Sequence, residues 1–172
     1  VLPNNGLDFP VQNVFRMFTK MSGQRVPASS SGEVPLQQIL ASGVRDRPDV
    51  AAVASRDGGR VSVLIWHYHD DDIAGDDAAI SLEVSGLGRI TTPATLTHYR
   101  IDERHSNTYA EWKRRGSPNA PDHKVYAELE KAGGLQLVEP AQSVRIERGR
   151  ARLGFDLPRQ GVSLIVIDAG AP

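Results

Sequence analysis

Apolar residues recur at two different spacings along this chain, and the change in spacing separates one helix from a run of strands. Near the start they follow the period of an α-helix, which predicts an amphipathic helix with one apolar stripe. The stripe consists of Val11, Val14, Phe15, Phe18 and Met21. Pro10 suits the first turn of this helix, and Gly23 suits its end. Nothing directly after it supplies a partner helix, so we expect the stripe to pack against a part of the protein outside this chain.

From residue 49 onward the spacing changes to two, which predicts β-strands. The predicted strands cover residues 50–55, 60–69, 79–84, 95–101, 142–147, 150–157 and 162–169. In the second strand, apolar residues lie on both faces, with Val63 and Ile65 on one and Leu64 on the other. This strand is therefore predicted to be central in its sheet. Short strands separated by Gly, Pro and Asp turns are typical of an antiparallel β-sandwich.

Helical patterns interrupt the strands once. They are predicted around residues 109–115 and over 122–132, where Gly133-Gly134 ends the second helix. Together they form a small helical insertion at about residues 105–133. Residues 24–35, rich in Ser, Gly and Pro, are predicted to be a loop. The predicted fold class is therefore mainly β: an antiparallel β-sandwich with a small helical insertion and an N-terminal helix.

Composition excludes several classes of function. The 172 residues carry a formal net charge of −1 and no cysteine. The balanced charge argues against a nucleic-acid partner or an anionic membrane, and the lack of cysteine excludes disulfides and zinc–thiolate sites. No apolar run approaches the roughly 20 residues of a membrane span, and no signal peptide is present. We expect a soluble protein of the bacterial cytoplasm or periplasm, and Val1-Leu2-Pro3 indicates an internal starting point, from processing or proteolysis.

The clearest candidate for metal chemistry is the run His67-Tyr68-His69-Asp70-Asp71-Asp72. Alternation along a strand places His67 and His69 on one face, with carboxylates directly after them. A metal site needs three or four converging ligands, and only these histidines have spacing support. The acidic run also lacks the alternating ligands and the glycine of a calcium loop. We therefore predict a solvated acidic turn, with no metal and no cofactor.

Polar donors and aromatic residues crowd together between His98 and Pro121. One interpretation is a structural corner, in which Ser106 or Asn107 caps a helix and its aromatic residues pack inward. The other is a substrate-binding site, with an aromatic platform for a sugar ring and polar groups around it. The candidate substrate-binding residues are His105, Asn107, Tyr109 and Trp112. The residue pattern leaves both interpretations open.

Three motifs in this chain resemble family 39 glycoside hydrolases, the β-xylosidases. The first, around Asn5-Gly6-Leu7-Asp8 and residues 10–18, resembles the entry to the last helix of the family's catalytic barrel. The second, residues 63–72, resembles its central sandwich strand. The third, residues 98–121, resembles the segment that follows the barrel. Within it, Arg115 departs from the methionine of the family's Lys/Arg-x-Met-Gly-Ser-Pro pattern.

The resemblance implies a (β/α)8 barrel followed by a β-sandwich. Residues 1–23 would be the end of the catalytic barrel, and residues 24–172 the sandwich domain with its insertion. The family's catalytic glutamates lie on barrel strands, one of them in an Asn-Glu motif, and no Asn-Glu pair occurs in this chain. We therefore assign no catalytic residue here. The helix with the uncovered apolar stripe would pack against a barrel that this chain lacks.

Read this way, the chain is the C-terminal, non-catalytic portion of a retaining β-xylosidase acting on β-1,4-xylosides. Its partner would be the catalytic (β/α)8 barrel of the same enzyme, and the resemblance also allows a xylo-oligosaccharide ligand and a homo-oligomer interface. The alternative function is a carbohydrate-binding β-sandwich module, in which Trp66, Tyr68, Tyr109 and Trp112 would stack on sugars.

Overall fold

The computed structural model of the protein describes residues 6–88 and 94–169. Four helices lie within these ranges: α1 (Pro10–Lys20), α2 (Leu36–Ser42), α3 (Thr108–Arg114) and α4 (His123–Gly133). The strands are β1 (Gln24–Val26), β2 (Asp49–Asp57), β3 (Arg60–Tyr68), β4 (Ala78–Val84), β5 (Ala94–Ile101), β6 (Gln136–Leu137), β7 (Gln142–Val144), β8 (Ala151–Leu157) and β9 (Gly161–Asp168). None of the described helices is long and apolar enough to cross a membrane.

The strands form two antiparallel sheets, as predicted. The larger sheet has the order β1-β2-β3-β9-β5-β6, with β7 also paired to β5, and the smaller sheet consists of β4 and β8. β2 and β3 make a hairpin whose register pairs Asp57 with Arg60 across Gly58-Gly59. Gly58 has a φ of +56°, a conformation that suits glycine in a tight hairpin turn. β3 lies between β2 and β9, which confirms the prediction of a central strand.

The two sheets enclose the main core, and the alternation of the strands explains its composition. Val61, Val63 and Ile65 point from β3 toward the smaller sheet, where they join Ile165 and Ile167 of β9. The β4–β8 pair covers them with the apolar side chains of Ile80, Leu82, Leu153 and Phe155. Burial of apolar side chains between sheets is the dominant stabilising term of such a fold.

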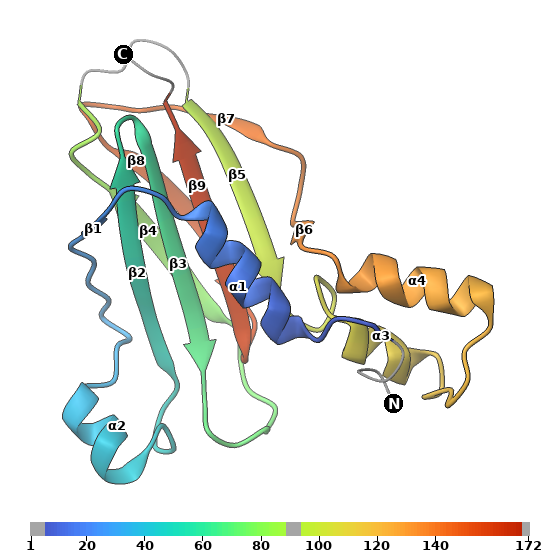
Figure 1. The fold of residues 1–172 in the computed structure, drawn as a ribbon. Helices are drawn as coiled ribbons and strands as arrows, with labels where there is room; N and C mark the ends of the chain where they lie inside the picture. Colours follow the sequence, from blue (N-terminus) through green and yellow to red (C-terminus); the bar gives the residue numbers. More distant parts are fainter. Residues whose placement is uncertain (1–5, 89–93, 170–172) are drawn as a thin grey trace.

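Helix α1 covers the opposite face of the larger sheet (Figure 1). Met17, which is 0% exposed, packs on Leu64, Leu164 and Val166, and Val14 and Met21 lie against the same cluster. The sequence predicted Val14 and Met21 to lie in a stripe with no partner in this chain, and the structure shows that both contact its own sheet. Val11, Phe15 and Phe18 remain 56%, 62% and 49% exposed.

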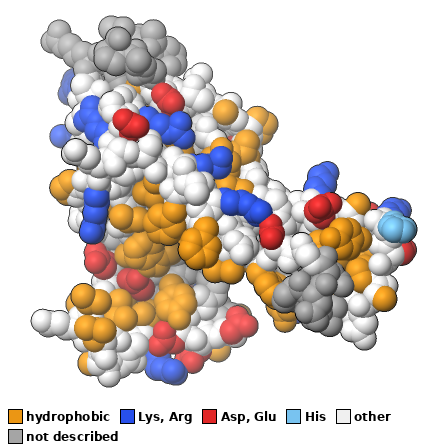
Figure 2. All heavy atoms as spheres, in the orientation of Figure 1, with side chains coloured by type: hydrophobic (Ala, Val, Ile, Leu, Met, Phe, Trp, Pro, Cys, Tyr) orange, Lys and Arg blue, Asp and Glu red, His pale blue; other side chains and the backbone are white. Residues whose placement is uncertain are grey.

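The helix therefore has two apolar sides rather than one stripe. Phe15 and Phe18 point away from the sheet that Met17 contacts, because residues one to two positions apart lie on different sides of a helix. Figure 2, in the orientation of Figure 1, shows hydrophobic side chains gathered on this face of the molecule. Only part of the predicted stripe is left for a partner beyond the described residues.

The segment between α1 and β2 contains two short elements, of which only β1 lies within the loop predicted over residues 24–35. The strand β1 pairs with β2, and α2 follows it and lies near the start of β2 (Figure 1). Gly23 has a φ of +78°, and a Cβ built on it would lie 2.0 Å from the carbonyl oxygen of Arg56. The close approach of two backbones explains this glycine, whereas helix α1 itself ends at Lys20.

Helices α3 and α4 form the predicted insertion and project from one side of the sandwich (Figure 1). Each begins with a side-chain cap: Asn107 accepts a hydrogen bond from Ala110 N, and Asp122 accepts one from Val125 N. A small cluster joins them, with Leu7 and Leu129 at its centre and Trp112 against it. The insertion thus has its own apolar centre, and the chain entering α1 contributes Leu7 to it.

Candidate functional site

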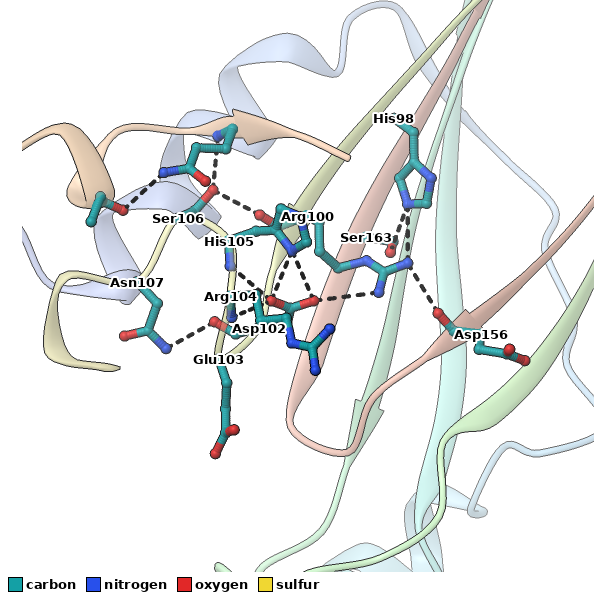
Figure 3. A network of polar contacts seen from close by, with 12 residues as sticks. His98, Arg100, Asp102, Glu103, Arg104, His105, Ser106, Asn107, Asp156 and Ser163 are labelled. Carbon is teal, nitrogen blue, oxygen red and sulfur yellow. Dashed lines mark hydrogen bonds and ion pairs between the residues drawn. The ribbon is translucent and has the colours of Figure 1, made fainter. Parts of the chain in front are cut away.

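The end of β5 and the turn that leads to α3, residues 98–107, are organised around the carboxylate of Asp102 (Figure 3). Its Oδ1 accepts hydrogen bonds from Arg104 N at 2.7 Å and His105 N at 2.8 Å. His105 Nδ1 lies 2.9 Å from the same oxygen, and Arg100 Nη1 lies 3.5 Å from Oδ2. Asp102 follows directly after β5, and its buried carboxylate both closes the turn and pairs with the buried guanidinium of Arg100.

Hydrogen bonding decides the ionisation of this carboxyl group. Burial of Asp102 disfavours its charged form, but the Arg104 N–H and the His105 side chain stabilise it more. The pKa of Asp102 therefore lies below its usual range. Burial lowers the pKa of the Arg100 guanidinium, and the neighbouring Asp102 opposes that shift. Separation of such a buried ion pair is costly, because it leaves one charge buried and unpaired, and this cost holds the turn in one geometry.

His98 and Arg100 extend the polar network from the corner into the sandwich (Figure 3). His98 Nε2 lies 3.0 Å from Ser163 Oγ, and Arg100 Nη2 donates to Asp156 O at 3.1 Å. The His98 ring packs at a tilt on Phe155, with ring centroids 4.7 Å apart. Burial, with smaller effects from Arg100 and His105, lowers the pKa of His98 to about 4. His98 is therefore a neutral imidazole near neutral pH.

Ser106 ties the corner to the rest of the molecule. Its backbone has a φ of 54°, and its side chain is completely buried. The hydroxyl donates to Arg100 O at 2.7 Å and accepts from Gln136 N at 2.8 Å. Asn13, also completely buried, reaches from α1 and donates through Nδ2 to Ser106 O and to Gly133 O, both at 2.9 Å. One amide thus joins α1, the corner and the end of α4.

The four predicted site residues form contacts with other parts of the chain and do not surround one open cleft. His105 contacts Asp102. Asn107 caps α3 through Oδ1 and donates through Nδ2 to Asp102 O at 3.0 Å. Trp112 packs on the cluster of the insertion, and its Nε1 donates to Pro118 O at 3.0 Å. These contacts match the corner interpretation, in which polar and aromatic groups fix a junction.

Tyr109 is the most exposed of the four predicted residues, with 45% of its surface accessible. Its ring stacks on Trp112, with centroids 5.8 Å apart, and Lys113 Nζ lies 5.1 Å from its centroid. Both contacts use the faces of the ring that a sugar would need for stacking. Tyr109 therefore contributes to the surface of the insertion, but its ring is already engaged.

The two histidines of the acidic run, His67 and His69, form hydrogen bonds with backbone groups. His67 Nδ1 donates to Leu157 O at 2.9 Å, and His69 Nε2 donates to Arg45 O at 2.8 Å while its Nδ1 accepts from Asp71 N. Within the described parts of the chain, no three His, Cys, Asp or Glu side chains gather in a way that could hold a metal ion. Asp70 instead accepts from Val44 N and so anchors the loop after α2.

The carboxylates on the insertion are engaged by arginine. Glu111 bonds to Arg115 at 2.8 Å and to Arg114 at 2.6 Å, and these partners hold its pKa below the usual range. Glu128 lies 2.7 Å from Arg115. A glycosidase acid needs a raised pKa, and here the shift of Glu111 has the opposite sign.

Sequence reasoning missed two residues that hold this corner, Asn13 and Ser106. Asn13 is not part of the predicted apolar stripe; it lies four residues before Met17 and so on the same side of α1, and this spacing was the available signal. For Ser106 the sequence predicts only a possible helix cap, because the left-handed conformation that it adopts has no signature in a single serine.

Comparisons with known proteins identify the fold and the family. The family profile described as glycosyl hydrolases family 39 matches residues 1–146. A family 39 enzyme from Xanthomonas axonopodis pv. citri superposes with a TM-score of 0.74 at 15% identity, covering 95% of this chain and 31% of its own. A monomeric β-xylosidase from Caulobacter crescentus CB15 gives 0.63 at 17% identity, with the same shares covered.

A third structure is described as the bacterial orthologue of human α-L-iduronidase. It gives a TM-score of 0.60 at 26% identity and covers 69% of this chain and 22% of its own. The chain thus spans less than a third of the length of these structures. A comparison with curated proteins gives no match.

Proposed function

The chain belongs to glycosyl hydrolase family 39, and we propose that it is the non-catalytic C-terminal portion of a retaining β-xylosidase. In the whole enzyme, β-1,4-xylosides would be hydrolysed through a covalent glycosyl-enzyme intermediate in a (β/α)8 barrel. This portion would hold the last helix of that barrel against the sandwich. Two observations support the proposal. The chain covers about 31% of the length of a family 39 structure, and it contains no Asn-Glu pair.

The two-sided helix α1 is the observation that carries the proposal. Its inner side is fixed to this chain by Met17 in the apolar cluster and by Asn13 at the corner. Its outer side presents Val11, Phe15 and Phe18, which are about half exposed or more. Exposed apolar residues in one patch are typical of a protein–protein contact. A helix held in this way would present that patch to a barrel as a fixed surface.

The corner supports the same role. Asp102 holds the turn, Ser106 links the turn to β5 and β6, and Asn13 links it to α1. These contacts would transmit the position of the sandwich to the barrel helix. None of them needs a substrate.

An activity assay on the isolated chain tests the absence of catalysis. We expect no turnover of an aryl β-xyloside above the rate in buffer, because Glu111 and Glu128 are paired with arginines and lack the environment of a catalytic acid. Turnover that a single Glu or Asp substitution in this chain abolishes would overturn the proposal. Turnover that survives all such substitutions would identify a contaminating enzyme.

The alternative function is a carbohydrate-binding module. The observation in its favour is the exposed Tyr109 stacked on Trp112, at the surface of the insertion. Against it stand the contact of Lys113 with the Tyr109 ring and the hydrogen bond that occupies Trp112 Nε1. Scaffolding therefore accounts for more of the contacts of these residues.

A further inference from the structure

Four arginines crowd around the turn between β7 and β8, at the end of the sandwich farthest from the corner. They are Arg145, Arg148, Arg150 and Arg152, and they line an open hollow of about 790 Å³ together with Val144 and Glu147. A second hollow of about 620 Å³ shares Arg148 and Arg150 and continues along Ser85, Gly86 and Gly88. The two hollows form one continuous basic surface, which we call the arginine hollow.

Carboxylates neutralise only part of this charge. Glu83 is shared between Arg150, at 3.1 Å, and Arg152, at 2.9 Å. Glu147 lies 3.6 Å from Arg145, and both side chains are largely exposed. Arg148 forms no ion pair with any residue in the described parts of the chain. The hollow therefore carries an excess of positive charge, although the whole chain has a formal net charge of −1.

The turn that carries Arg148 is rigid and unfavourable for arginine. Glu147 and Arg150 exchange two backbone hydrogen bonds, and Leu87 N donates to Gly149 O at 3.0 Å, which fixes the turn to the end of β4. Arg148 and Gly149 have φ values of 52° and 74°. A two-residue turn of this kind favours Asn-Gly, because a residue with a Cβ is strained at a positive φ. Arg148 nevertheless occupies this position, and its exposed side chain lines the hollow.

From this geometry we infer that the arginine hollow binds an anionic polysaccharide that carries spaced carboxylates. Arginine guanidinium groups bind carboxylates through two parallel hydrogen bonds. Gly86, Gly88 and Gly149 form a low wall, which leaves room for a sugar backbone beside the charges. Glu83 and Glu147 would repel a densely charged nucleic acid, which has one charge per 1.7 Å or so of duplex, more than a uronate chain with one charge per sugar.

The inference depends on the arginines of the sandwich and on membership of a glycosyl hydrolase family, and it does not need the barrel proposal. Such a site would tether the protein to acidic polysaccharide chains without taking part in bond cleavage. Its failure and the failure of the proposed function are separate, because the two involve opposite ends of the sandwich.

Calorimetric titration of the 172-residue chain with polygalacturonate tests the inference directly. We expect saturable binding that weakens as salt increases, because exposed charges are screened beyond about 8–10 Å at physiological ionic strength. Neutral xylan at the same concentration should give no heat of binding. An absence of binding to polygalacturonate at low salt would overturn the inference, and so would equal or tighter binding to duplex DNA of matched charge.

Paired variants locate the site. The double variant Arg145→Gln/Arg148→Asn removes two charges and places a favoured residue in the turn, so we expect a loss of affinity of at least about tenfold. The control Arg104→Gln/Lys124→Gln removes the same charge from the other end of the molecule and should retain the affinity. If the first variant changes the circular dichroism spectrum, Arg152→Gln on β8 replaces it, with an expected loss of several-fold. Equal losses in the hollow variants and the control would contradict the site.

Discussion

The properties of individual residues explain why a stretch that resembles an active site is organised as a corner. Asp102, His105, Ser106 and Asn107 all direct their polar atoms at the backbone or at each other. Each of these bonds satisfies a group that the sharp exit from β5 would otherwise leave unpaired. Catalytic groups have to direct their polar atoms at a substrate, and here those atoms are already occupied.

Substitution of Asp102 measures how strongly this corner contributes to stability. Asp102→Asn leaves the buried Arg100 without its counter-charge, and we expect it to lower the free energy of unfolding by about 3–5 kcal/mol. Glu103→Gln, an exposed neighbour, should change it by less than about 0.5 kcal/mol. Urea denaturation, monitored by circular dichroism, measures the free energy of unfolding of both variants. Equal, small effects of both substitutions would show that the Asp102 network does not stabilise the fold.

Tryptophan fluorescence separates scaffolding from sugar binding at Tyr109 and Trp112. We expect xylo-oligosaccharides to leave the emission of the chain unchanged, because the aromatic rings already contact each other and Lys113. The titration should be repeated with Trp112→Phe, which retains an aromatic ring in the cluster. Saturable quenching of the unmodified chain that disappears in Trp112→Phe would favour the binding module.

The pH dependence of stability reports on His98. Its folded pKa of about 4 lies below the ordinary 6.5, so the folded state resists protonation. The stabilisation from the neutral ring is complete above pH 6.5 and decreases as the pH falls toward 4, because the unfolded chain takes up the proton first. His98→Gln should flatten the stability curve in this window. An unchanged slope in the variant would exclude His98 as its source.

At the scale of elements, α1 has two apolar sides, and the helical period of its sequence alone could not separate them. The apolar residues predicted the helix and its need for a partner. They did not show that Met17 and Asn13 define one contact side while Phe15 and Phe18 define another. Both sides are apolar, and a hydrophobic stripe does not say which neighbour covers it.

Alanine substitutions on the two sides of α1 distinguish these contacts. Met17→Ala removes a side chain that is 0% exposed, and we expect a loss of about 2–5 kcal/mol in the free energy of unfolding. Phe15→Ala, on the exposed side, should change it by less than about 0.5 kcal/mol. Thermal denaturation of both variants provides the comparison. A large loss for Phe15→Ala would mean that this side chain already has a partner within the chain.

The longer strands and the insertion were predictable because their patterns are local. Alternation along residues 60–68 and the capping residues of α3 and α4 are visible in the sequence itself. The order of the strands depends on distant pairing, such as β3 with β9, which no local pattern reports. β1, β6 and α2 were missed because each is short and is defined by a neighbour or a turn rather than by a run of apolar residues.

At the scale of the whole molecule, the chain has one covered and one uncovered side of α1, a rigid corner and a basic end. The family match extends over residues 1–146, and the family structures are about three times as long as the part that this chain covers. These facts together support the proposal that this chain positions a catalytic domain and that another part of the enzyme performs the chemistry.

The most direct test is size-exclusion chromatography of the protein from its native source, followed by peptide mass spectrometry of the fractions that hydrolyse an aryl β-xyloside. The account predicts that peptides of this chain occur in the active fractions together with peptides of a (β/α)8 barrel that contains an Asn-Glu motif. Denaturation should give either one polypeptide about three times the length of this chain or a separate barrel chain. Active fractions that contain this 18.7 kDa chain without any barrel would contradict the account.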